Sequence, residues 1–111
     1  MSDTEKLHDE SALDQLPLPE ATFEFLVFSL GLQAQQQLGL LSVPGDEEGK
    51  FPPNLRLASH TIDLLGVLLE KTRGNLTHEE HRYLENSLTE LRYRYVQVAD
   101  SLKKKQEQNQ N

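Results

Sequence analysis

The 111-residue sequence contains no cysteine and no tryptophan, and it has a single methionine. Without cysteine the chain has no disulfide, no thiol nucleophile and no thiolate metal ligand, which fits a protein of a reducing compartment. Long apolar runs are also absent. The longest nearly uncharged apolar stretch, residues 25–32, is much shorter than the roughly 20 residues that a membrane span requires. We therefore expect a protein that does not enter a membrane.

Basic residues are few, because 11 lysines and arginines stand against 18 acidic residues and give a formal net charge of -7. A negative surface is repelled by the phosphates of nucleic acids and by anionic lipids, so neither is an expected partner. Much of the excess lies in residues 1–20, which are acidic and polar. This stretch lacks a basic start followed by an apolar segment, as an export signal would have, and we expect a cytoplasmic protein.

The spacing of apolar residues predicts three helices. The first covers about residues 20–39, where apolar residues fall on one stripe, and Gly39 ends it. The second covers about residues 55–73, with Asn54 as its N-cap. The third covers about residues 77–102, where alternating spacings of four and three form a heptad seam. The stripe of the first helix is Phe23, Leu26, Val27, Leu30, Ala34 and Leu38, and the seam is Leu84, Leu88, Leu91, Tyr95, Val98 and Leu102.

A short junction joins the second helix to the third. Gly74 is expected to end the second helix, and Asn75 follows it in the turn. Thr77 and Glu80 have the spacing of a capping box, in which each side chain accepts a hydrogen bond from the other residue's backbone N–H. This junction predicts that the two helices form an antiparallel hairpin. Three of its residues have no evident role in the turn and are candidates to contact another helix or a partner: Lys71, Arg73 and Asn75.

These elements predict an all-α fold, a small bundle of three main helices in a single helical domain of residues 20–102. Residues 42–54 combine proline, glycine and charge without a period and are expected to form an exposed loop. The acidic residues 1–19 and the polar residues 103–111 lack regularly spaced apolar side chains and are expected to be disordered tails. The seam of the third helix fits either packing within the chain or an intermolecular coiled coil.

Two stretches resemble a known protein family. They are LGVLLEKTRGNLTHEE, which ends at Glu80, and LTELRYRY, which ends at Tyr95. Both are similar to the uncharacterised bacterial family known as domain of unknown function 1844 (DUF1844), and the resemblance covers about residues 23–98. It implies a bacterial, cytoplasmic, helical protein. It implies no particular activity, cofactor or catalytic residue.

Histidine and acidic side chains offer little chemistry. His78 and His81 are three residues apart, whereas the zinc-protease helix places its histidines four apart on one face. His60 and Asp63 lie about one turn apart and suggest one alternative function, a small enzyme with an acid-base pair on the second helix. The solvated face of an amphipathic helix needs such polar residues in any case. We therefore expect no catalytic, cofactor-binding or metal site, and no small-molecule substrate is evident.

The basic carboxyl-terminal end suggests a second alternative, nucleic-acid binding. Residues 92–95 alternate arginine and tyrosine, and residues 103–105 are lysines. Basic and aromatic side chains together form surfaces for single-stranded nucleic acid. The helical period scatters these residues around the third helix, so they do not predict one continuous platform.

The first helix has a second apolar stripe, formed by Phe25, Phe28 and Leu32, opposite the stripe expected to face the core. A helix that is apolar on two sides is enclosed in a bundle or shared with another chain, and three helices offer little enclosure. These residues predict a surface for self-association or for a protein partner. The favoured function is therefore protein interaction, as a homodimer or as a subunit bound to another protein.

Overall fold

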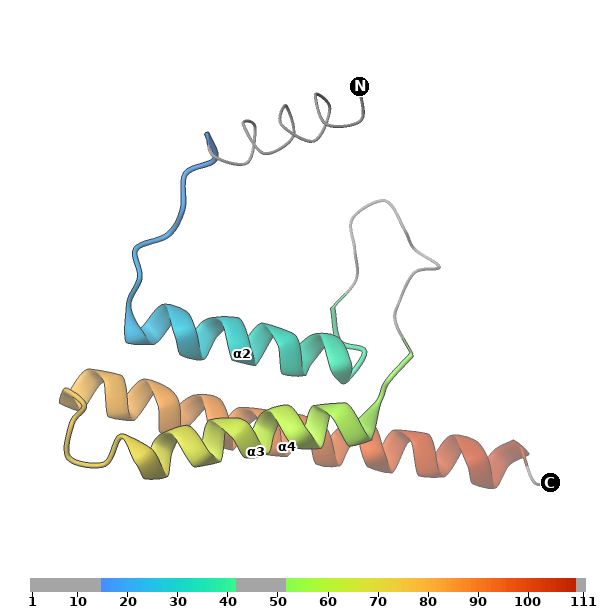
Figure 1. The fold of residues 1–111 in the computed structure, drawn as a ribbon. Coiled ribbons are helices and arrows are strands. Elements are labelled where there is room, and N and C mark those ends of the chain that lie inside the picture. The colour runs from blue at the N-terminus through green and yellow to red at the C-terminus, as the bar shows by residue number, and fades with distance from the viewer. Residues whose placement is uncertain (1–14, 42–51, 110–111) are drawn as a thin grey trace.

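The computed structural model describes residues 15–41 and 52–109, which form three helices and no strand (Figure 1). The helices are α2 (Phe23–Gln37), α3 (Leu55–Lys71) and α4 (His78–Asn109), and each packs against the other two. α2 and α4 run in the same direction, and α3 runs opposite to both (Figure 1). The expected all-α bundle of three helices, with α3 and α4 as an antiparallel hairpin, is confirmed.

Side-chain caps define the starts of the first two helices. The N–H of Phe25 donates to Thr22 Oγ1 at 3.0 Å, and the N–H of Leu57 donates to Asn54 Oδ1 at 3.1 Å. Each cap satisfies a backbone donor that has no partner within its helix. Gly39 follows the end of α2 with a φ of 75°, a conformation that glycine adopts without strain. The predicted Asn54 cap and the predicted stop at Gly39 are thus confirmed, whereas the Thr22 cap was not predicted and starts α2 at Phe23 rather than near residue 20.

The core lies where the three helices meet. Leu84, Leu88 and Leu91 of the predicted heptad seam are buried there against residues of α2 and α3, and Tyr95 is half-buried beside them. The seam therefore packs within the chain along the first half of α4. The complete buried cluster is Val27, Ala34, Ile62, Leu65, Leu84, Leu88 and Leu91.

Polar contacts join the end of α2 to the region around the start of α3. Thr61 is 1% exposed, and its Oγ1 donates to Gln37 Oε1 at 2.6 Å. The N–H of Asn54 donates to the Gln37 carbonyl at 2.7 Å. A buried hydroxyl needs such a partner, because leaving it unpaired costs about 1–3 kcal/mol. No pattern in the sequence predicts this contact, since it depends on how two helices lie together.

α4 is longer than predicted. Instead of ending near residue 102 it continues to Asn109, so residues 103–109 of the predicted disordered tail are helical. This segment contains lysine, glutamine and glutamate, which favour helix, and it has no glycine or proline. Lys104 Nζ lies 3.4 Å from Asp100 Oδ2, one turn earlier, which adds modest support. The helix therefore extends beyond the last apolar residue of its seam.

The predicted core stripe of the first helix is also partly wrong, because Leu26 is 46% exposed. α2 packs against α3 and α4, and two neighbours cover less of its circumference than the predicted stripe spans. Residues 15–19 of the predicted amino-terminal tail lie outside the helices and are exposed. Residues 1–14 and most of the predicted loop at residues 42–54 lie outside the described residues.

Candidate association surface

α2 carries a line of exposed apolar side chains, the α2 stripe, formed by Phe25, Phe28 and Leu32. Their exposed fractions are 38%, 48% and 38%. The ring centroids of Phe25 and Phe28 are 6.4 Å apart, within the range in which aromatic rings attract one another. Val27 and Ala34, on the core side of the same helix, are both 0% exposed. α2 therefore has a buried face and a separate apolar face in contact with solvent.

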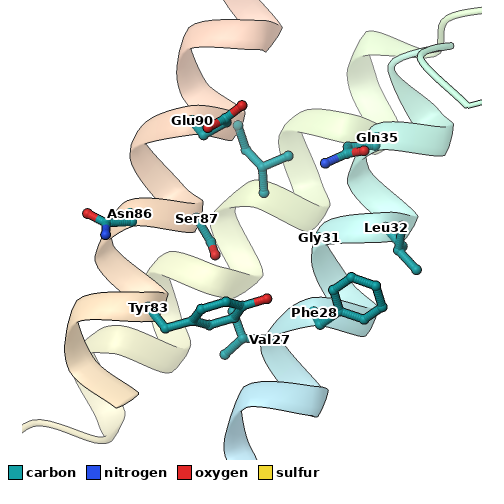
Figure 2. A pocket seen from close by; sticks show the side chains of 10 residues that line it. Val27, Phe28, Gly31, Leu32, Gln35, Tyr83, Asn86, Ser87 and Glu90 are labelled. Atoms are coloured by element: carbon teal, nitrogen blue, oxygen red, sulfur yellow. The ribbon is translucent and has the colours of Figure 1, made fainter. Parts of the chain in front are cut away.

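A groove of about 310 Å³ lies beside the α2 stripe, between α2 and α4 (Figure 2). Phe28 and Leu32 project from α2 at its edge, and Tyr83 reaches from α4 toward α2 (Figure 2). The groove thus continues the apolar surface of the stripe to a second helix. Its lining residues are Val27, Phe28, Gly31, Leu32, Gln35, Tyr83, Asn86, Ser87, Glu90 and Leu91.

Gly31 leaves the α2 side of this groove open. A Cβ atom placed on Gly31 would meet no other heavy atom within 4 Å. Glycine inside a helix costs about 1 kcal/mol of helix stability relative to alanine. Nothing in the packing of residues 15–41 and 52–109 requires that cost, and among these residues the space over Gly31 is free.

The surface around the stripe and the groove is almost uncharged. Of the 15 residues of α2, only Glu24 carries a charge. The charged group in the groove lining is Glu90, whose carboxylate lies 3.0 Å from Arg94 Nη2 and accepts a hydrogen bond from Arg94 Nε at 3.1 Å. An exposed pair of this kind adds little stability, but it neutralises the carboxylate locally. A partner therefore meets no unpaired charge along the groove lining.

The junction between α3 and α4 contains the predicted capping box. The N–H of Thr77 donates to Glu80 Oε1 at 2.8 Å, and the N–H of Glu80 donates to Thr77 Oγ1 at 3.1 Å. Gly74 has a φ of 78°, and the N–H of Asn75 donates to the Thr72 carbonyl at 2.9 Å. Each of these residues has a local structural role, because together they end one helix and start the next.

The charged residues of the junction lie on its surface. Lys71 and Arg73 are both exposed, and Arg73 Nη2 lies 3.0 Å from Glu70 Oε1 in the preceding turn. Asn75 is also exposed. All three side chains lie at the surface, and their contact with another helix or a partner stays a prediction.

His60 and Asp63 both lie exposed on α3. The depression that both of them line is formed by α3 and its N-cap, including Arg56 and Ser59, whereas a second depression, between α3 and α4, is lined by Asp63 but not by His60. Acid-base catalysis depends on a site that encloses the substrate and orients it against the reacting groups. One helix face provides no such enclosure, so the geometry adds no support to this pair as a catalytic site.

The two histidines at the start of α4 also lie at its surface. His81 Nε2 pairs with Glu85 Oε1, one turn further along α4, and His78 is exposed. Across residues 15–41 and 52–109, no three histidine or acidic side chains gather as metal ligands would. Among the described residues, His78 and His81 therefore do not belong to a cluster with metal-binding geometry.

The basic and aromatic residues of α4 point in different directions. Tyr93 is 65% exposed, whereas Tyr95 packs against the core, and Arg94 pairs with Glu90. The three lysines at residues 103–105 lie exposed further along the helix. These residues do not form a single platform for bases.

None of the helices in the described part of the chain has the length and apolar character needed to cross a bilayer.

The groove is the part of this surface that sequence patterns do not reveal. Gly31 and its neighbours on α2 line it together with Tyr83, Asn86 and Ser87 of α4, which lie far away in the sequence. Each residue by itself fits an ordinary helix. Only the parallel packing of α2 beside α4 brings them together, so no local signal predicts the groove.

The structure defines the class of this protein as a small all-α three-helix bundle, with an exposed apolar line on α2 and an adjoining groove. A family model described as domain of unknown function (DUF1844) matches residues 20–97. The match includes all of α2 and α3 and every residue that lines the groove. The chain therefore belongs to the DUF1844 family. Comparisons with curated proteins and with solved structures find no match.

Proposed function

We propose that this DUF1844 protein is a protein-association module without catalysis of its own. Its contact surface consists of the α2 stripe and the groove between α2 and α4. The observation that carries the proposal is the exposure of Phe25, Phe28 and Leu32, at 38%, 48% and 38%, on a helix with one charged residue. Apolar surface that one chain leaves in water is a common mark of a binding site.

The energetics support this use of the stripe. Fully burying a phenylalanine or leucine side chain contributes about 1.5–3 kcal/mol, and each stripe residue still exposes more than a third of its surface. Covering the remainder is therefore worth about 1 kcal/mol per residue. Aromatic side chains seated in a pocket contribute most of the energy in many protein interfaces. The groove offers such a pocket directly beside the stripe.

The proposal includes a cytoplasmic location in a bacterial cell. The location is supported by the absence of cysteine, since small secreted domains of this size usually depend on disulfides. The bacterial origin is supported by the resemblance to DUF1844.

The test is quantitative affinity capture of the tagged full chain from its native cells after brief chemical crosslinking. Phe28→Asp places a charge on the stripe, and Gln33→Asp is the matched control because it adds the same charge at another exposed position on α2. We expect Phe28→Asp to lose the proteins, including untagged copies of this chain, that the wild type and Gln33→Asp retain. Equal capture by all three forms, with unchanged circular dichroism, contradicts the proposal.

A further inference from the structure

The arrangement of the three helices leaves a position for a fourth. α2 and α4 run in the same direction, α3 runs opposite to both, and the groove lies between α2 and α4 (Figure 1). Small helical bundles commonly contain four helices that alternate in direction. A helix laid in the groove antiparallel to α2 and α4 gives this alternation, and the dipoles of antiparallel neighbours attract one another. The topology therefore sets the direction of a fourth helix.

The groove has the length and the room for about two helical turns. It is lined by residues 27–35 of α2 and by residues 83–91 of α4, and eight residue steps of a helix span about 12 Å. Val27 and Leu91 form its floor, since they are 0% and 2% exposed. A cavity of about 150 Å³ holds a benzene ring, so the groove of about 310 Å³ has room for large apolar side chains from successive turns.

The two walls of the groove differ in chemistry (Figure 2). The α2 wall is apolar through Phe28 and Leu32, whereas the α4 wall carries the uncharged amide and hydroxyl groups of Asn86 and Ser87. Glu90, the charged group of the lining, is already in an ion pair within α4. A complementary surface has apolar side chains toward α2, hydrogen-bonding but uncharged side chains toward α4, and no charge of its own.

A helix suits these walls better than an extended peptide. Extended peptides bind mainly by adding a strand to a sheet edge, and residues 15–41 and 52–109 contain no strand. In the groove, the backbone N–H and C=O groups of an extended peptide would face Phe28 and Leu32, which offer no hydrogen bond. A helix satisfies its backbone groups internally, so it can set apolar side chains against α2 without unpaired polar groups.

The chain itself does not supply this helix. Residues 1–14 contain five acidic residues and one lysine, and their two leucines, Leu7 and Leu13, would fall about 120° apart on a helix. Phe25 and Gly31 are also about 120° apart around α2, so two copies paired along their α2 stripes turn Phe25 away from the groove. The occupant with the required chemistry therefore comes from another protein.

We propose that the groove between α2 and α4 binds an amphipathic helix of another protein, antiparallel to both. Its contact face carries apolar side chains at positions i, i+3 or i+4, and i+7, and it carries no charge. The middle one of these side chains fills the space over Gly31, where a Cβ would meet no heavy atom within 4 Å. This inference rests on the proposed function, since it names the class of partner for the same surface.

The first test identifies the occupant by photocrosslinking from single cysteines, because the natural chain contains no cysteine. Asn86→Cys places a benzophenone on the α4 wall, and Gln33→Cys is the control at an exposed position of α2 outside the groove. Each purified full chain is irradiated in a lysate of its native cells, and the linked peptides are sequenced by mass spectrometry. We expect Asn86→Cys, but not the control, to link a peptide of another protein with the stated apolar spacing and uncharged face.

The second test measures the affinity of that peptide, made synthetically, for the full chain by fluorescence anisotropy. Gly31→Leu fills the space over Gly31, and Gln33→Leu is the matched control because it adds the same side chain to α2 outside the groove. We expect Gly31→Leu to raise the dissociation constant at least about 30-fold, the loss of one anchor side chain. The smaller Gly31→Ala should raise it about three- to tenfold, and the control should change it less than about threefold. Circular dichroism checks that all variants are folded.

The third test determines the direction of the bound helix through a disulfide, which needs Cα atoms within about 7 Å. Gln35 lines the groove near the carboxyl end of α2. In the antiparallel complex, Gln35→Cys crosslinks to a peptide with a cysteine beside its first contact residue and not to one with a cysteine beside its last. A parallel complex gives the reverse result.

Several results overturn the inference. They are links from Asn86→Cys to residues 1–14, to a second copy of this chain or to a segment with a charged contact face, no link above the control, unchanged affinity in Gly31→Leu and Gly31→Ala, or the parallel crosslink. If one of these occurs while Phe28→Asp still loses proteins captured from cells, the proposed function stands and the surface binds in another way. If Phe28→Asp also captures the same proteins as the wild type, both proposals fail.

Discussion

Replacing Thr77 by alanine tests whether the capping box holds the start of α4. The change removes the Oγ1 atom that accepts the N–H of Glu80 at 3.1 Å. The reciprocal bond, from the N–H of Thr77 to Glu80 Oε1 at 2.8 Å, uses backbone and glutamate atoms and remains possible. The substitution therefore isolates one of the two bonds of the box.

The expected loss follows from the surroundings of this bond. Replacing an N-cap threonine by alanine costs about 0.5–2 kcal/mol in folded proteins. Thr77 is exposed and Glu80 is half-buried, so water can replace part of the lost bond. We expect a loss of about 1 kcal/mol in the free energy of unfolding. In so small a domain the free energy of unfolding falls by about 1 kcal/mol for each molar of urea, so this loss lowers the urea concentration at the unfolding midpoint by about 1 M.

The assay is urea unfolding followed by far-ultraviolet circular dichroism, at one fixed protein concentration because association adds to apparent stability. Thr77→Ser keeps the accepting oxygen and should retain the wild-type midpoint. Thr89→Ala is the matched deletion inside α4, where the Thr89 hydroxyl donates to the Glu85 carbonyl at 3.0 Å. That bond adds little to a helix, so this control should be neutral or slightly stabilising. A midpoint for Thr77→Ala no lower than that of Thr89→Ala refutes the reasoning.

Two further predictions concern the core and the glycines. Leu88 is 1% exposed, so Leu88→Ala should cost about 2–5 kcal/mol and lower the melting temperature in calorimetry by more than about 8 °C; a fall of less than about 4 °C argues against its place in the core. Gly74→Ala should lower the urea midpoint, because its φ of 78° strains any residue with a Cβ by about 1–2 kcal/mol. Gly66→Ala should raise the urea midpoint, because alanine favours the helix by about 1 kcal/mol over glycine and its Cβ would lie 3.6 Å from Arg92 Nη2, an ordinary contact. If both glycine substitutions shift the midpoint in the same direction, these two predictions are contradicted.

Local signals in the sequence are sufficient for most of the helix limits. Asn54 and the pair of Thr77 and Glu80 are predicted as caps, and all three make the capping hydrogen bonds. A cap involves residues within three positions of one another, so its chemistry is visible in a short stretch. The end of α4 is the exception, because residues 103–109 carry neither a stop signal nor an apolar residue, and helix propensity continues the helix to Asn109.

The sequence by itself determined the fold class, the junction between α3 and α4, and the presence of two apolar faces on α2, because each depends on periodicity or on neighbours within a helical turn. Only the tertiary structure decided which apolar side chains remain outside, such as Leu26, and how Thr61 is satisfied by Gln37. It also created the groove over Gly31, whose walls come from two helices separated by all of α3. Packing between distant segments sets these features, and no local pattern encodes it.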